Sequence, residues 1–208
     1  QVAAMKSFLR GKDYDNLLLV DVICQGVPSP GIFKKYIEEV EAKYHTKVVD
    51  ATFRSKKYGW RCGLLLLLLL CEDGRHIELK YGRNAFYRSF LRSYFIRESC
   101  FHCQFKTPNK GCFADITLAD FWRIGNTVPF KCDTYESGVS AVLTNNSKGQ
   151  QLFESIKKEI IWEERTFEEF STNGGLRIAR RPSDLDEAFK TVYKENFDTI
   201  QEKYYPYT

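Results

Sequence analysis

Apolar runs and alternating segments along the chain predict a series of strands. Residues 16–24 read NLLLVDVIC, a continuous apolar run with one acid, which predicts a strand buried on both faces. Seven consecutive leucines at residues 64–70 predict a second buried strand, because the hairpin signal Asp73-Gly74 follows them; a short buried helix is the alternative. Further strands are predicted at residues 47–54, 76–81, 114–119 and 139–144.

Helical periodicity and capping residues predict four helices between and after these strands. They cover residues 32–44, 85–95, 147–158 and 184–204. Ser29 is placed to cap the first helix, and Pro30 suits its first position. Asn84 and Ser183 are placed to cap the second and the last. Because strand–helix units are mixed with hairpins, we predict an α/β fold, a mixed β-sheet flanked by helices, with a cysteine-rich loop.

Length and charge narrow the class of protein. The 208 residues suit one large domain or two small ones, with enough length for a sizeable core. The net charge of +4 arises from 31 basic and 27 acidic residues, which are too evenly matched to indicate nucleic-acid binding. The leucine run is shorter than the roughly 20 apolar residues of a membrane helix, and residues 1–10 lack a secretory h-region. We therefore expect no membrane span and a cytoplasmic protein.

The seven cysteines favour reduced thiols or metal ligands over a disulfide framework. Cys100 and Cys103 form a C-x-x-C loop, a spacing at which two thiolates reach one zinc ion or one iron–sulfur cluster. The alternatives are small buried apolar residues, or a redox pair like that of thioredoxin, which usually opens a helix directly after a strand. His102, between the two cysteines, suits an exposed loop position better than a ligand role.

Two further cysteines are candidate ligands of the same site. Cys24 ends the first predicted strand, and Cys112 lies nine residues after Cys103. Together with the C-x-x-C pair they make up the four thiolates that a structural zinc site needs. The others have no partner nearby in sequence and are expected to be small buried residues: Cys62, Cys71 and Cys132.

Five separated stretches of the chain read VDVICQGVPSP, FRSKKYGWR, SCFHCQFK, ADITLADFW and SGVSAVLTN. In this order they resemble the C-terminal region of the coenzyme F420 hydrogenase/dehydrogenase beta-subunit family. The resemblance covers residues 1–151, and a predominantly helical tail, residues 152–208, carries no recognised motif. It implies that this single domain is the C-terminal part of a longer beta-subunit-like protein.

The resemblance implies an iron–sulfur flavoprotein, an electron-transfer subunit of oxidoreductase type that holds a [4Fe–4S] cluster and FAD. The cluster cysteines of the family correspond to Cys24, Cys100 and Cys103. The family pattern places the fourth ligand and the flavin-binding glycine-rich segment upstream of Gln1. It also implies a redox partner protein or ferredoxin-like domain, and a deazaflavin or other small acceptor.

Three other residues are predicted to bind the cofactors: Lys106, Asp115 and Thr117. Lys106 lies three residues after Cys103, where its charge would offset a cluster or hold an anionic flavin ring; a solvated surface lysine is the alternative. If residues 114–119 form a strand, alternation places Asp115 and Thr117 on one face. A basic cluster precedes Tyr58-Gly59-Trp60 and suits a cofactor phosphate, an acidic partner or merely a solvated strand end: Arg54, Lys56 and Lys57.

The chain departs from the family pattern at three positions. Relatives have His at Gln25, and they have Gly at Ala119 and Arg123. A glycine lets the backbone approach a cofactor closely, so Arg123 argues against tight packing there, unless its guanidinium meets a phosphate.

Three hypotheses follow. The first is a redox subunit, the second a non-catalytic binding module stabilised by zinc, and the third a scaffold whose cofactor site stays empty. A cluster absorbs visible light and zinc does not, so colour separates the first two hypotheses. Metal analysis of protein purified without oxygen distinguishes all three.

Overall fold

The computed structural model describes residues 1–60, 66–106, 113–131, 135–171 and 173–206. The chain forms two compact units, each built from two segments of sequence. The first unit comprises Gln1–Cys24 and Gln104–Ile178, and the second comprises Gln25–Cys103 and Ala179–Thr208. The α/β class is confirmed, but the strands divide between two sheets where the sequence predicted one. The organisation as a single domain stays a prediction.

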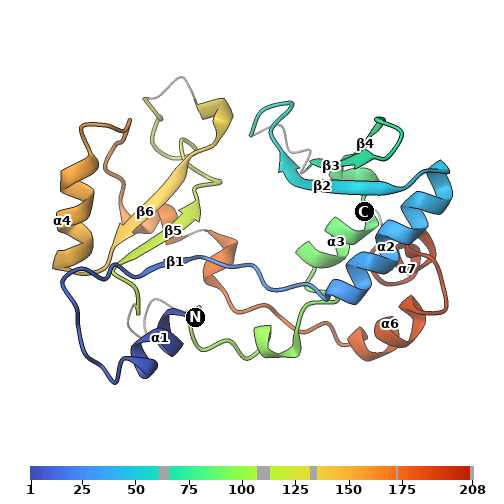
Figure 1. Cartoon of the computed structure of the whole chain (residues 1–208), viewed down its shortest axis with the longest axis horizontal. Coiled ribbons are helices and arrows are strands. Elements are labelled where there is room, and N and C mark those ends of the chain that lie inside the picture. Colours follow the sequence, from blue (N-terminus) through green and yellow to red (C-terminus); the bar gives the residue numbers. More distant parts are fainter. Residues whose placement is uncertain (61–65, 107–112, 132–134, 172, 207–208) are drawn as a thin grey trace. The chain divides into compact units, whose positions relative to one another are not determined.

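The first unit is built on a small mixed sheet with the strand order β1-β5-β6 (Figure 1). Strand β1 runs parallel to β5, and β5 pairs with β6 in the antiparallel sense. Its elements are α1 (Val2–Phe8), β1 (Val20–Val22), β5 (Ile116–Asp120), η4 (Tyr135–Ser137), β6 (Ser140–Thr144), α4 (Ser147–Ile156), α5 (Phe167–Ser171) and η5 (Gly174–Leu176). The predicted strands at residues 114–119 and 139–144 and the helix at 147–158 are thereby confirmed.

Strand β1 corrects the expectation for residues 16–24. Only Val20–Val22 form the strand, and the side chains of Val20 and Val22 are 43% and 66% exposed. The strand lies at the edge of the sheet because β5 occupies the centre. The prediction of a strand buried on both faces was therefore wrong: a run of apolar residues cannot distinguish a central strand from an edge strand.

The second unit is built on an antiparallel sheet with the order β2-β3-β4, and its helices lie on one side of that sheet (Figure 1). Its elements are α2 (Pro30–Tyr44), β2 (Val48–Ser55), β3 (Leu66–Cys71), β4 (His76–Leu79), η1 (Tyr81–Arg83), α3 (Ala85–Leu91), η2 (Glu98–Cys100), α6 (Leu185–Val192) and α7 (Phe197–Tyr204). The described leucines of the run, residues 66–70, all lie in β3, so the helical alternative was wrong; Leu64 and Leu65 lie outside the described residues.

The hairpin after the leucine strand forms as predicted. The amide of Cys71 donates to the carbonyl of Arg75 at 2.9 Å, and the amide of Gly74 donates to the carbonyl of Cys71 at 3.0 Å. Gly74 has a φ of +80°, a left-handed conformation that glycine adopts without steric cost. The turn thus pairs β3 with β4 in register, with Leu69 opposite Ile77.

The main apolar core lies in the second unit. Helix α2 contributes Ile32, Tyr36 and Val40, which recur at helical spacing and are at most 5% exposed. The ring of Phe197 in α7 packs edge-on against Tyr36 with the centroids 5.0 Å apart. Further members come from the sheet, from α3 and the residues that follow it, and from the C-terminal helices and the residue after α7: Leu67, Leu69, Ile77, Leu79, Phe86, Phe95, Leu185, Ala188, Val192, Ile200 and Tyr205.

Two predicted helices differ from the expectation: one is divided into two helices and the other is shorter. The segment 184–204 is two helices, because the chain turns at residues 193–196 and Asn196 caps α7 by accepting from the amide of Thr199 at 2.9 Å. Asp184, not Ser183, occupies the N-cap position of α6. Helix α3 ends at Leu91, short of residue 95, and its predicted cap Asn84 accepts from the amide of Tyr87 at 2.9 Å.

None of the helices in the described part of the chain combines the length and the apolar character that a bilayer crossing demands.

Candidate functional site

The loop before α2 is bound by its main chain to the segment that carries the C-x-x-C pair. The amide of Ser29 donates to the carbonyl of Phe95 at 2.8 Å, and the amide of Arg97 donates to the carbonyl of Val27 at 2.9 Å. Pro28 and Ile96 lie between these bonds as an isolated antiparallel bridge. Residues 27–29 and 95–97, some 70 positions apart in sequence, therefore form a short two-stranded ladder within the second unit.

Cys100 lies at the end of this ladder. The short helix η2 places it there, with its amide donating to the carbonyl of Arg97 at 2.9 Å. The amide of Val27 donates to the Sγ atom of Cys100 at 3.4 Å. Hydrogen bonds of this kind to cysteine sulfurs are a common feature of metal and cluster sites.

Gly26 allows the loop before α2 to lie close to the side chain of Ile96. Its φ is +153°, and a Cβ atom built on it would lie 3.2 Å from Cδ1 of Ile96. Cys100 and Cys103 are both partly exposed, and neither forms a disulfide. The pair is thus accessible at the surface of the second unit and is held by a defined backbone.

His102 extends into solvent, as the sequence predicted. Its side chain is 77% exposed, and Nε2 lies 3.7 Å from Oε1 of Glu98. Glu98 also accepts from Nε of Arg181 at 3.2 Å, and Arg181 pairs with Asp186 at 2.7 Å. Hydrogen bonds to Asp186 and Glu98 raise the pKa of Arg181 above its ordinary value, although desolvation opposes them. These exposed charges fasten the cysteine loop to the segment before α6.

The other described cysteines occupy different environments. Cys24 is exposed and is the last residue of the first segment of the first unit, whereas Cys71 is buried in β3 as a small core residue, in accord with its predicted role. The sequence candidates Cys62, Cys112 and Cys132 lie outside the described residues. Over the residues that the structure describes, no group of three or more His, Cys, Asp or Glu side chains gathers as a metal site.

In the first unit, Asp115 is buried and its carboxylate has internal partners. Oδ2 accepts from the amide of Leu19 at 2.7 Å, and Oδ1 accepts from Nδ2 of Asn146 at 2.7 Å. The main chain of Asp115 donates to the carbonyl of Leu19 at 2.8 Å and accepts from the amide of Asn145 at 2.9 Å. Asp115 therefore connects the residue before β1 to the turn between β6 and α4.

Thr117 belongs to the same network. Its Oγ1 accepts from Nδ2 of Asn145 at 2.8 Å, and the same amide group donates to the carbonyl of Ala114 at 3.1 Å. Gly149 in the first turn of α4 packs so closely that an added Cβ would lie 2.1 Å from the carbonyl oxygen of Asp115. The predicted pair, Asp115 and Thr117, is thus brought together as expected, but within the interior of the unit. Their cofactor-binding role stays a prediction.

Lys106 is buried, with 9% of its surface exposed. Its Nζ donates to the carbonyl of Arg177 at 3.1 Å. The alternative of a solvated surface lysine was therefore wrong. The predicted role of Lys106 beside a cluster or an anionic flavin ring stays a prediction.

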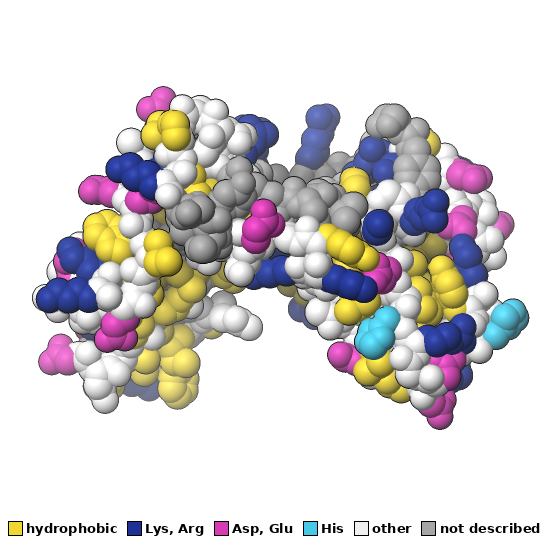
Figure 2. Space-filling view, turned by 90° about the horizontal axis from the view of Figure 1, so that it is seen from above, with side chains coloured by type: hydrophobic (Ala, Val, Ile, Leu, Met, Phe, Trp, Pro, Cys, Tyr) yellow, Lys and Arg dark blue, Asp and Glu magenta, His cyan; other side chains and the backbone are white. Residues whose placement is uncertain are grey.

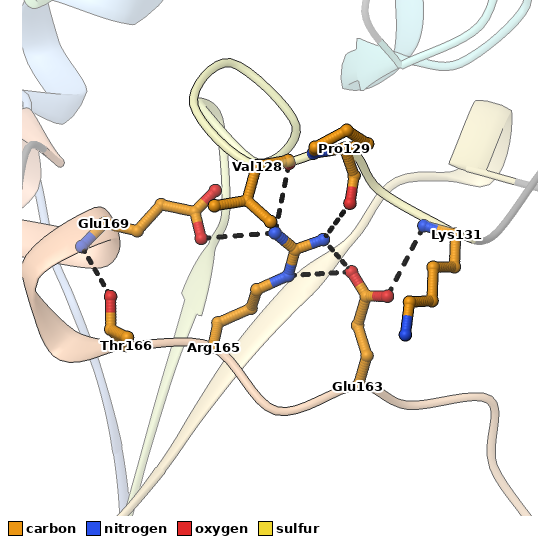
Figure 3. A network of polar contacts seen from close by, with 7 residues as sticks. All are labelled: Val128, Pro129, Lys131, Glu163, Arg165, Thr166 and Glu169. Carbon is orange, nitrogen blue, oxygen red and sulfur yellow. Dashed lines mark hydrogen bonds and ion pairs between the residues drawn. The ribbon is translucent and has the colours of Figure 1, made fainter.

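Arg165 is a residue that the sequence did not single out. Its guanidinium donates to the carbonyl of Val128 at 3.1 Å and to that of Pro129 at 2.9 Å, and it pairs with Glu163 and Glu169 (Figure 3). The Arg165 side chain is only 10% exposed. Burial alone lowers its pKa, but the carboxylate of Glu163 and then that of Glu169 raise it, and the net pKa lies above the ordinary value.

The Arg165 network binds two segments of the first unit that are distant in sequence. It fixes the loop that follows β5 to the segment before α5 through charge-assisted bonds. The only sequence signal is the group of alternating charges in EERTFEE, which is indistinguishable from a solvated surface. Asn145 and Asn146 were missed for a similar reason, because Asn-Asn before a helix indicates only a cap.

Comparison with known families shows which family the chain matches. The family model for the C terminus of the coenzyme F420 hydrogenase/dehydrogenase beta subunit matches residues 1–169. The match extends past the predicted motif region through the Arg165 network to the start of α5 and ends at Glu169. No curated protein matches the chain.

Proposed function

Because the chain belongs to the coenzyme F420 hydrogenase/dehydrogenase beta-subunit family, we propose that it is an electron-transfer subunit of an oxidoreductase, in which Cys24, Cys100 and Cys103 bind a [4Fe–4S] cluster. FAD would serve as the second cofactor. Thiolates are the ligands such clusters need, and a C-x-x-C pair is one of their usual sources.

The observation that carries the proposal is the N–H···S bond from Val27 to Cys100 at 3.4 Å. It attaches the segment that follows Cys24 to the sulfur of the C-x-x-C loop. Cys24 precedes Val27 by three residues, and each residue extends the chain by at most about 3.6 Å, so its Cα lies within about 11 Å of that of Val27. Covalent connection thus limits how far Cys24 can lie from Val27.

The residues fit a cluster by their chemistry, and the proposal makes one structural demand. The described side chains do not gather three ligands, so Cys24 has to approach the pair when the cluster binds, and a fourth ligand is needed. The amide of Val27 would stabilise the bound thiolate of Cys100, since hydrogen bonds to cluster sulfurs set the reduction potential. The buried ammonium of Lys106 would provide positive charge beside the anionic centre.

Asp115 and Thr117 would act through position. Their oxygens hold the edge strand β1 and the turn before α4, and β1 leads directly toward Cys24. The cluster would carry single electrons and the flavin would couple them to a two-electron acceptor such as a deazaflavin, with a ferredoxin-like domain or redox partner on the donor side.

Anaerobic reconstitution with iron and sulfide tests the proposal. We expect iron and sulfide to be taken up together, with a broad visible absorption that bleaches on reduction. Cys100→Ala should abolish this uptake, whereas Cys71→Ala, a matched change at a cysteine of the second unit away from the loop, should retain it. Uptake of zinc in place of iron, or equal uptake by the two variants, would contradict the cluster assignment.

A further inference from the structure

One end of the β2–β4 sheet in the second unit carries an excess of positive charge. We call this end the basic rim; it comprises the charged residues of segments 54–60 and 78–83. Glu78 is the only carboxylate in these two segments. Their cations are all exposed: Arg54, Lys56, Lys57, Lys80 and Arg83. In Figure 2, which views the molecule from above, lysine and arginine side chains stand on the face of this unit.

Strand register brings the two segments of the basic rim together. Ser55 at the end of β2 pairs with Leu66, and the neighbouring Leu67 pairs with Leu79 at the end of β4. Lys80, which follows Leu79, therefore lies at the same end of the sheet as the residues that follow Ser55. The short helix η1, Tyr81–Arg83, continues from there and adds another cationic position.

A tight turn fixes the centre of the rim. The amide of Gly59 donates to the carbonyl of Lys56 at 2.8 Å, and Gly59 has a φ of +85°. This arrangement places Lys57 and Tyr58 at the two central positions of a four-residue turn. Trp60, which follows the turn, is 9% exposed and anchors it to the interior.

The ring of Tyr58 lies between two ammonium groups. Nζ of Lys57 is 5.6 Å from the ring centroid, and Nζ of Lys80 is 5.3 Å from it. The hydroxyl of Tyr58 donates to Oε2 of Glu78 at 2.8 Å, and Lys57 pairs with the other oxygen of Glu78 at 2.5 Å. Glu78 therefore orients Tyr58 and Lys57, and as a single carboxylate it leaves the two segments with a net positive charge.

Aromatic surface accompanies the charge. Tyr58 is 45% exposed and Phe53, directly before Arg54, is 43% exposed. The inner side of Phe53 packs against Phe33 and Tyr87 with centroid distances of 5.1 and 5.8 Å, so the ring is held in place while part of it faces solvent. Lone surface lysines are ordinarily solvated, but Tyr, Phe and Arg together are the residue types enriched in protein interfaces.

We infer that the basic rim is the docking surface for the acidic face of a redox partner protein. The inference rests on the proposed electron-transfer function, because it names the partner of that function by its charge. Positive potential around a few fixed aromatic rings attracts a negatively charged surface over a distance of about one Debye length and orients the encounter. Electron-transfer complexes of this kind are small and short-lived, so a rim of a few residues suffices.

The test compares two charge reversals of equal size within one unit. Lys57→Glu with Lys80→Glu changes the rim, and Lys34→Glu with Lys43→Glu changes exposed lysines of α2 by the same amount. The probe is a purified acidic ferredoxin, titrated by calorimetry at low and at moderate salt. We expect the rim reversal to weaken binding about tenfold or more at low salt, and the α2 reversal about twofold or less. Lys57→Gln with Lys80→Gln should give an intermediate loss.

Several outcomes would overturn the inference. These are equal losses in the two reversals, binding that does not respond to salt, no binding by the unaltered protein, or tighter binding of a single-stranded oligonucleotide than of the ferredoxin. The cluster assignment fails separately, since rim-dependent binding without iron uptake would leave the docking surface in place and remove the cofactor. In reconstituted protein, the rim reversal should slow electron transfer from the ferredoxin and leave reduction by a small viologen dye unchanged.

Discussion

Each of the two units is stabilised internally by a different balance of interactions. The large apolar cluster lies wholly in the second unit, where the sheet, α2, α3, α6 and α7 bury aliphatic and aromatic side chains together. The first unit has a small sheet with an exposed apolar row across its strands, Val22, Leu118 and Val142, which are 66%, 38% and 40% exposed. Within its described residues it buries fewer apolar side chains, among them Phe121 and Phe170, whose rings pack edge-on. Buried polar groups add connections between its segments: the Asp115 network and the Arg165 network.

This difference indicates how each unit will respond to substitution. Apolar burial is non-directional and is shared among many contacts, so its loss scales with the volume removed. Hydrogen bonds between buried polar groups are directional, and removal of one partner leaves the other without compensation in a poorly solvated place. We therefore expect the second unit to be sensitive to cavities and the first to be sensitive to single polar changes.

The largest expected effect is a cavity in the second unit. Phe197 is 1% exposed and contacts the rings of Tyr36 and Phe95. Phe197→Ala should lower the free energy of unfolding by about 3–5 kcal/mol. Hydrogen exchange of β3 amides measures the stability of this unit. Phe8→Ala is the control, since Phe8 is 82% exposed; a similar loss in both variants would contradict the assignment of the core.

The second prediction breaks the Arg165 network of the first unit. Arg165→Met keeps the apolar stem and removes the guanidinium, which leaves the carboxylates of Glu163 and Glu169 without it at 18% and 7% exposure. We expect a loss of about 3 kcal/mol, measured by hydrogen exchange of β5 amides. Lys34→Met, at an exposed pair of α2, should change stability by less than about 0.5 kcal/mol. An Arg165 variant as stable as the control would show that the network is solvated.

The third prediction concerns Asp115. Asp115→Asn replaces one accepting oxygen by an NH₂ group, so that the side chain can no longer accept through separate oxygens from the amide of Leu19 and from Nδ2 of Asn146. The expected loss is about 1–3 kcal/mol, localised to β1 and the turn before α4. Asp50→Asn, an exposed position in β2, is the matched control. Exchange protection that persists around Leu19 would contradict the structural role.

The smallest effect at neutral pH, and the sharpest contrast between the units, is expected in alkali. Burial raises the pKa of Tyr87 to about 12 and raises those of Tyr36 and Tyr205 further. All three tyrosines belong to the second unit. A raised folded-state pKa gives stability that is fully present below the unfolded value near 10 and is lost as the pH rises through the folded value.

The second unit should therefore lose stability between about pH 10 and pH 12. Tyr87→Phe should flatten this pH dependence with little change at pH 7, when unfolding is followed by denaturant titration at each pH. Tyr193→Phe, at a residue that is 63% exposed, should leave the slope as it was. A pH profile that Tyr87→Phe does not alter would show that this phenol ionises in the folded state as it does in the unfolded one.

Much of the local structure followed from sequence, because its causes lie within a few residues. The spacing of Ile32, Tyr36 and Val40 predicts the buried face of α2, and Asn84 predicts the start of α3. The Asp73-Gly74 turn predicts the β3–β4 hairpin in the same way. The C-x-x-C pair was also apparent, because the spacing of its two cysteines alone defines the motif.

Long-range relations were decided by tertiary structure. The order β1-β5-β6 made residues 20–22 an exposed edge, and no pattern within the apolar run encodes which strand lies in the centre. Lys106 and Arg165 are buried because each donates to a carbonyl group that is distant in sequence. These carbonyl groups are those of Arg177 and Pro129. The C-terminal helix divided at residues 193–196, although its periodicity continued through them.

The sequence by itself determined which residues can donate electrons to a metal, which faces are apolar and where turns occur, because side-chain chemistry and short-range sterics are properties of the residues themselves. Only the tertiary structure decided that Val27 meets the sulfur of Cys100 and that Asp115 bonds to Leu19 and Asn146. Such partners are separated by tens of residues. Their pairing depends on the packing of the whole unit, where the entropy lost in closing long loops is offset by burial elsewhere.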